Sequence, residues 1–120
     1  MASLATNADD NAKPTSLSDA RKAVEANLRS PEGKSFDEKL GTDFVQHHLD
    51  AFRRCKQAAG ADLGNFWTLL KLKQDGSVEE VLLYPATKLG TCARADLLKE
   101  TFPAPPHADY WVSVYMRLSH

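Results

Sequence analysis

The sequence has no excess of charge of either sign and no long apolar run. It carries 15 lysines and arginines against 16 aspartates and glutamates, a formal net charge of −1 over 120 residues. This balance provides no long-range field that would attract nucleic acid or an anionic membrane. No apolar run approaches the roughly 18 residues of a membrane-spanning helix, so we expect no membrane insertion by this segment.

The short motifs of common catalytic and cofactor sites are also missing. The sequence contains no phosphate-binding loop, dinucleotide fingerprint, nucleophile elbow or H-E-x-x-H pair. His47 and His48 are adjacent on a predicted helix, where neighbours point about 100° apart and do not easily bind one ion. We expect His48 at the edge of the core and His47 in solvent. We therefore predict a protein that is not an enzyme and holds no metal or cofactor.

Cysteines are few, with only Cys55 and Cys92 in the chain. An even count in a small domain permits one disulfide, and two buried thiols are the alternative that is usual in cytosolic proteins. Because both cysteines fall at ends of predicted helices, we favour the disulfide. The absence of a C-x-x-C pair argues against a thioredoxin-like redox site or a zinc knuckle.

The N-terminal stretch differs in composition from the rest. Residues 1–15 are rich in Asn, Asp, Ala and Thr, which predicts a disordered leader ahead of a single domain over residues 16–120. The first seven residues show no signal-peptide pattern. They fit a cytosolic start or a start methionine placed where a signal peptide was removed, and the cysteines favour the second.

Apolar spacing predicts two N-terminal helices. The first opens at Ser16 and buries Ala20, Val24 and Leu28 at steps of four. We expect Ser30–Gly33 to end it and Ser35–Glu38 to start the second as a capping box. The second helix runs to Gly60 with large apolar and aromatic residues and His48 at steps of four, and Gly41 marks an expected kink or break.

The period then changes to two, which predicts strands. Residues 65–73 and 78–84 flank Asp75-Gly76, a strong hairpin signal that we assign to a type I′ turn. With this two-residue loop, Trp67 faces Tyr84, and Lys71 faces Glu80, an attractive charge pair.

A third helix and a third strand complete the chain. Thr91 is expected to cap a helix that runs to about Thr101 and buries Ala93, Leu97 and Leu98. After a proline-rich connector, residues 110–118 alternate as one antiparallel strand. The predicted fold class is α+β: two N-terminal helices, then a β-hairpin, a helix and a strand, forming a three-stranded antiparallel sheet.

This sheet would have apolar side chains on both faces. The predicted register places Trp67, Leu69, Leu82 and Tyr84 on one face, and strand alternation separates Trp111 and Tyr115 from Val112 and Val114. The last helix covers one face, and the other is covered either by the chain's own helices or by a partner. We therefore predict a protein-binding surface formed by large aromatic residues: Trp67, Tyr84, Tyr110, Trp111 and Tyr115.

From about Phe44 to Leu118 the pattern resembles the C-terminal domain of TonB energy transducers. It is most similar to the related two-cysteine periplasmic domains of myxobacterial motility proteins. The resemblance rests on Phe52–Cys55 at a helix end, on Asp75–Val78 between strands, on Cys92 at a helix start, and on Phe102-Pro103 before the last strand. It implies a Cys55–Cys92 disulfide, a periplasmic location, no enzymatic activity and protein binding by strand addition at the last strand.

We therefore expect a non-catalytic periplasmic or secreted binding or scaffold domain that engages an unidentified protein through its sheet edge or aromatic face. An exposed edge strand also allows a homodimer. The alternative is a small secreted inhibitor or immunity protein that blocks an enzyme or toxin with a loop, either Pro85–Gly90 or Pro103–His107.

Overall fold

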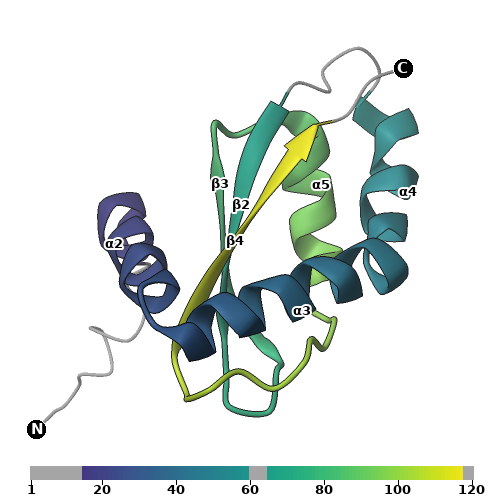
Figure 1. The fold of residues 1–120 in the computed structure, drawn as a ribbon. Coiled ribbons are helices and arrows are strands. Elements are labelled where there is room, and N and C mark those ends of the chain that lie inside the picture. Colours follow the sequence, from purple (N-terminus) through teal and green to yellow (C-terminus); the bar gives the residue numbers. More distant parts are fainter. Residues whose placement is uncertain (1–14, 60–64, 118–120) are drawn as a thin grey trace, which may run out of the picture.

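A computed structural model describes residues 15–59 and 65–117, and it shows an α+β domain (Figure 1). Its antiparallel three-stranded sheet has the order β3-β2-β4. The elements in chain order are α2 (Leu17–Leu28), α3 (Pro31–His47), α4 (Leu49–Ala59), β2 (Asn65–Leu72), β3 (Val78–Tyr84), α5 (Lys88–Leu97) and β4 (Tyr110–Arg117). The predicted fold class is confirmed. The predicted leader lies outside the described residues except for Thr15, whose amide and hydroxyl both donate to the Glu80 carboxylate.

Each face of the sheet packs against its own set of helices. Helices α3, α4 and α5 cover the inner face, and α2 alone lies on the outer face (Figure 1). The larger, inner core is built around fully buried aromatic and aliphatic side chains: Leu40, Phe44, Phe52, Phe66, Leu70, Leu72, Val81, Leu89 and Leu97. The smaller, outer cluster joins Ala20 and Val24 to Leu69 and Trp111. The period-two pattern therefore predicted correctly which strand residues share a face.

The second helix begins earlier than the sequence suggested. The Ser30 hydroxyl accepts the Gly33 amide at 2.9 Å, and Pro31 occupies the first helical position, where its missing N–H costs nothing. The predicted capping box at Ser35 is therefore wrong, because Ser35 lies inside α3. Ser30-Pro31 ends one helix and starts the next.

The helix breaks at His48 and not at Gly41. Gly41 lies inside the unbroken α3, whereas His48 leaves helical geometry with φ −122° and separates α3 from α4. The His48 imidazole turns inward and stacks on Phe102, with ring centroids 4.0 Å apart. A glycine lowers the stability of a helix by only about 1 kcal/mol, and Gly41 does not break α3. The contacts of His48 with the rest of the fold therefore set the position of the break.

The hairpin has the predicted register and a different turn. Trp67 pairs with Tyr84 and Lys71 with Glu80, as expected. A type I′ turn is wrong, because Gly76 (φ +90°) has positive φ and Asp75 does not. The Gly76 amide donates to the Lys73 carbonyl at 2.9 Å, which makes a three-residue loop with glycine at its left-handed position. A register shift between Lys71 and Leu72 absorbs the extra residue.

The cap of α5 also differs from the prediction. The Thr87 hydroxyl accepts the Gly90 amide at 2.9 Å, so the cap of α5 lies four residues before the predicted cap at Thr91. Helix α5 ends at Leu97, and Leu98, which we expected to be buried, is 43% exposed. The early start follows from a second threonine, one turn upstream, that offers the same capping group.

Helices α4 and α5 are joined by the predicted disulfide between Cys55 and Cys92, whose Cα atoms lie 5.7 Å apart. Arg54 adds a 3.0 Å ion pair to Asp96 across the same helix pair. Within the described part of the chain, none of the helices combines the length and apolarity needed to cross a membrane.

Candidate functional site

Helix α2 covers only part of the outer face of the sheet. Its buried residues Ala20 and Val24 pack on Leu69 and Trp111. The Asn27 amide donates to the Trp111 carbonyl at 2.9 Å and fixes the end of α2 to the start of β4. The opposite end of this face, where β2 begins and β3 and β4 end, extends beyond α2 (Figure 1).

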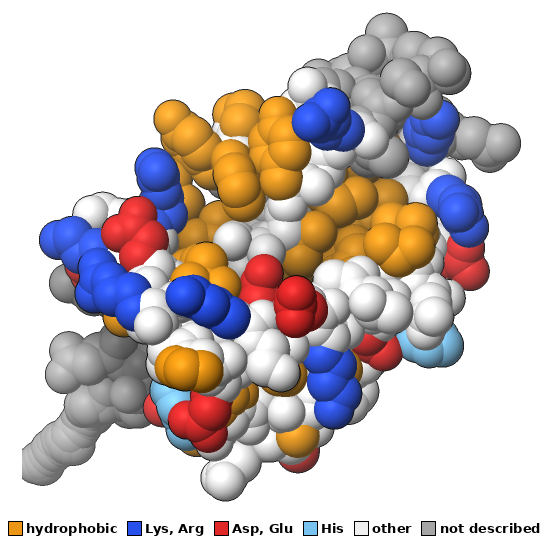
Figure 2. All heavy atoms as spheres, in the orientation of Figure 1, with side chains coloured by type: hydrophobic (Ala, Val, Ile, Leu, Met, Phe, Trp, Pro, Cys, Tyr) orange, Lys and Arg blue, Asp and Glu red, His pale blue; other side chains and the backbone are white. Residues whose placement is uncertain are grey.

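Three aromatic side chains form a row across the uncovered end. Trp67 on the central strand pairs with Tyr84 on one side and with Tyr115 on the other. The rings of Trp67 and Tyr115 have centroids 4.9 Å apart. Trp67, Tyr84 and Tyr115 are 43%, 49% and 43% exposed. We call these three residues the aromatic row. Figure 2 shows hydrophobic side chains gathered over this end of the sheet, with Lys and Arg side chains beside them.

The other two predicted binding residues do not belong to this surface. Trp111 is 5% exposed and lies beneath α2, and Tyr110 is 3% exposed in the inner core, with its ring edge-on to Phe36. Burial, with smaller contributions from Asp37 and Glu32, raises the pKa of the Tyr110 phenol. The predicted five-residue set therefore divides into three exposed and two buried members.

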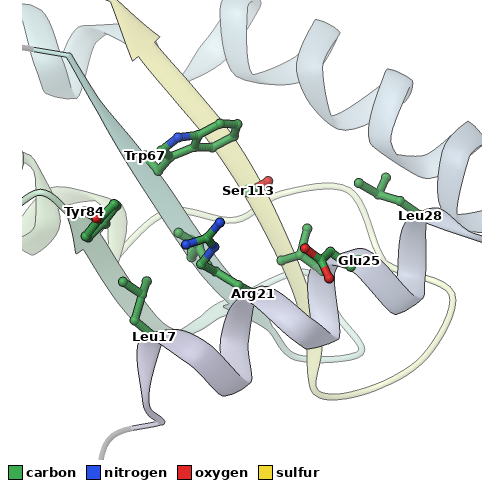
Figure 3. Close-up of a pocket in the computed structure, with 9 residues that line it drawn as sticks. Leu17, Arg21, Glu25, Leu28, Trp67, Tyr84 and Ser113 are labelled. Carbon is green, nitrogen blue, oxygen red and sulfur yellow. The ribbon is translucent and has the colours of Figure 1, made fainter.

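A groove of about 250 Å³ runs between α2 and the aromatic row (Figure 3). Buried Leu69 and Val24 are among the residues that line it, and Trp67 and Tyr84 face it from the strands. The complete lining is Leu17, Arg21, Val24, Glu25, Leu28, Trp67, Leu69, Tyr84 and Ser113.

The sequence reasoning missed the α2 contribution to this groove. Leu17 and Leu28 lie near the two ends of α2 and are only partly buried, although they belong to its apolar stripe. The sequence contained a sign of this contribution, because the apolar stripe belongs to a helix of 12 residues, about 18 Å long. A helix of this length is too short to cover all the aromatic residues on this face of the sheet.

Among the described residues, one side-chain hydrogen bond reaches the backbone of each edge strand. At the β3 edge, Arg94 of α5 donates to the Val81 carbonyl at 2.7 Å. At the β4 edge, Asn27 binds the Trp111 carbonyl. In residues 15–59 and 65–117, no side-chain hydrogen bond reaches the backbone of β4 from Ser113 to Arg117. This stretch of edge adjoins the aromatic row at Tyr115.

The two histidines have the predicted exposure, and His48 forms a cluster with two carboxylates. His48 is 5% exposed, and His47 lies mostly in solvent. The two ring nitrogens of His48 contact carboxylates of Asp43, at 2.8 Å, and Glu100. Among the residues that the structure describes, no group of three or more acidic, His or Cys side chains is arranged to hold a metal ion.

His48 lies in the inner layer, whereas the aromatic row and the groove lie on the outer face. The His48 ring contacts two carboxylates and Phe102, which is the environment of a side chain that stabilises the fold. The surface best suited to recognition is therefore the aromatic row with its groove. Comparisons of this chain with protein-family models, with curated proteins and with solved structures found no match.

Proposed function

We propose that this chain is a non-catalytic binding domain that engages another protein through the aromatic row and the adjoining edge of β4. The observation that carries the proposal is the line of Tyr84, Trp67 and Tyr115 across three strands, each between two-fifths and half exposed. Trp and Tyr are the residue types most enriched among binding hot spots. Their rigid rings bury large areas with little loss of conformational entropy.

The disulfide supports an oxidising compartment, which we propose to be the periplasm or the extracellular space. Disulfides persist in such compartments and are rare in the reducing cytosol. Membership of a TonB C-terminal-like family, suggested by the sequence pattern, is part of the same proposal. Pairing between two β4 edges would also give a homodimer, which sedimentation at several concentrations would detect.

Affinity capture from a periplasmic extract tests this function with one variant and one matched control. Trp67→Ala removes the centre of the aromatic row, and Leu98→Ala removes an apolar side chain of equal exposure, 43%, from the end of α5. We expect the wild type and Leu98→Ala to retain the same protein and Trp67→Ala to lose it. A captured set that is identical for all three proteins would contradict the proposal.

The identity of the captured protein separates this function from its alternative. An envelope assembly supports a binding or scaffold domain. A single hydrolase or toxin, inhibited by the chain, would replace the proposal with an inhibitor or immunity function. Of the two loops considered for that role, Pro85–Gly90 ends inside α5, where Leu89 and Gly90 are buried.

A further inference from the structure

Arg21 is a cation at the rim of the apolar groove that forms no ion pair with another described residue. It extends from α2 over the groove, between Tyr84 and Glu25 (Figure 3). Among the described residues, no carboxylate lies within ion-pair distance of its guanidinium, and Glu25, one turn further along α2, forms no ion pair either. A guanidinium in this position has its full hydrogen-bonding capacity available to a bound acceptor.

The cations at this end of the outer face outnumber the acids. Lys22 lines the continuation of the groove past Leu17 and Tyr84, and Arg117 follows Tyr115 on the same face of β4. In the described part of the chain, neither cation forms an ion pair with a carboxylate. Glu25 is the single acidic residue in the groove lining.

The closed end of the same face shows the opposite arrangement. There Lys71 lies within 4.0 Å of carboxylates from Glu79, Glu80 and Asp109. Glu80 also accepts two hydrogen bonds from Thr15. The cation at the closed end thus has acidic partners, whereas among the described residues Arg21, Lys22 and Arg117 at the open end have none. A complementary ligand for the open end is anionic.

The shape of the groove favours a polypeptide among anionic ligands. The part beside Trp67 measures about 250 Å³, and the groove continues past Leu17 and Tyr84 into a second depression of about 370 Å³. Both parts are open to solvent, so the groove is elongated and not an enclosed pocket. It holds one or two side chains of a polypeptide and leaves the rest of that polypeptide outside.

We propose that the groove binds an acidic peptide segment of the partner. One large apolar side chain of the segment enters between α2 and Trp67, and a nearby carboxylate pairs with Arg21. This inference rests on the proposed function, because it names the chemistry that the surface beside the aromatic row recognises.

Selection from a display library of random 12-residue peptides against the immobilised chain supplies defined probes. Each selected peptide should contain Trp, Phe or Leu. It should also contain Asp or Glu within about one helical turn or one strand repeat of that apolar residue. A synthetic copy of the most enriched peptide then serves for fluorescence-anisotropy titration. Selected peptides without acidic residues, or no selected peptide at all, would overturn the inference.

The matched variants are Arg21→Glu in the groove and Lys39→Glu on α3. Lys39 is exposed, forms no ion pair among the described residues and is absent from the groove lining, so both variants change the net charge equally. We expect Arg21→Glu to weaken peptide binding by about fivefold or more at low salt, with a smaller effect at high salt, and Lys39→Glu to leave it nearly unchanged. Equal weakening by both variants would refute the role of Arg21.

A third variant distinguishes failure of this inference from failure of the proposed function. If Trp67→Ala abolishes peptide binding and Arg21→Glu does not change it, the aromatic surface stands and the acidic peptide is wrong. If Arg21→Glu abolishes binding and Trp67→Ala has no effect, the charge inference stands and the aromatic row is not the anchor.

Discussion

His48 joins parts of the chain that are far apart in the sequence. Its imidazole lies between Asp43, on the helix before the break, and Glu100, beyond the end of α5, and it stacks on Phe102 of the connector that follows. A single side chain therefore fixes the α3–α4 corner to the segment that leads into β4. Its neighbour His47 points into solvent, with a 4.0 Å contact to Asp43 and its ring edge-on to that of His48.

The two histidines provide a matched test at the scale of one residue. His48→Ala leaves two partly buried carboxylates without their hydrogen-bond partner and opens a cavity beside Phe102, so we expect a loss of about 2–4 kcal/mol in unfolding free energy. His47→Ala should change stability by less than about 0.5 kcal/mol. Urea denaturation of both variants measures the difference. Equal effects would show that the buried cluster contributes nothing specific.

The aromatic residues show what sequence alone resolves at this scale. Alternation correctly separated Trp111 from Tyr110 across the sheet, because side chains on a strand alternate between faces. It could not separate Trp111 from Trp67, which share a face, because their exposure depends on where α2 crosses. That crossing is set by the contacts of Val24 and Asn27 with β4 and by the length of α2.

At the scale of elements, the hairpin turn is anchored to a distant connector. Gly76 has φ +90°, and its carbonyl accepts the Phe102 amide at 2.8 Å. A Cβ on Gly76 would lie 1.9 Å from the Phe102 carbonyl oxygen. Positive φ and close backbone approach together require glycine at this position.

Two glycine substitutions with opposite expected signs test this requirement. Gly76→Ala forces the hairpin away from Phe102 and should lower the unfolding free energy by at least about 2 kcal/mol. Gly41→Ala should raise it by roughly 0.5–1 kcal/mol, because a Cβ there meets open space inside a helix. Thermal unfolding followed by circular dichroism measures both. A Gly76→Ala protein as stable as wild type would contradict the described turn.

Helices and strands could be predicted where short-range sequence patterns determine them. The strand register was predicted correctly from alternation and from the Lys71–Glu80 pair. It is correct although the predicted turn type is wrong, because a bulge absorbs the extra residue of the loop. Helix starts were less predictable, because the chain offers two capping residues at each start: Ser30 and Ser35, then Thr87 and Thr91. The break at His48 was not predictable, since it depends on Glu100, 52 residues away.

At the scale of the whole molecule, the disulfide links α4 to α5 across a sequence separation of 37 residues. Closing a loop of this length restricts the unfolded chain and should stabilise the domain by roughly 3–4 kcal/mol. The Cys55→Ala/Cys92→Ala variant should lose stability by this amount and become insensitive to reductant. Urea denaturation with and without dithiothreitol measures the effect. Wild-type protein that shows two reactive thiols when unfolded without reductant would contradict the bridge.

The outer helix and the inner helices are held by separate hydrophobic clusters with no buried residue in common. We therefore expect α2 to open without disturbing Phe44, Phe52 or the disulfide, because such partial openings cost less free energy than global unfolding. Native-state hydrogen exchange should show α2 amides exchanging through a low-energy opening, well before those of β2. Each opening would bare Leu69 and Trp111 and briefly extend the aromatic row into a larger apolar platform. Opening of α2 would therefore decide how much apolar surface a binding partner could reach.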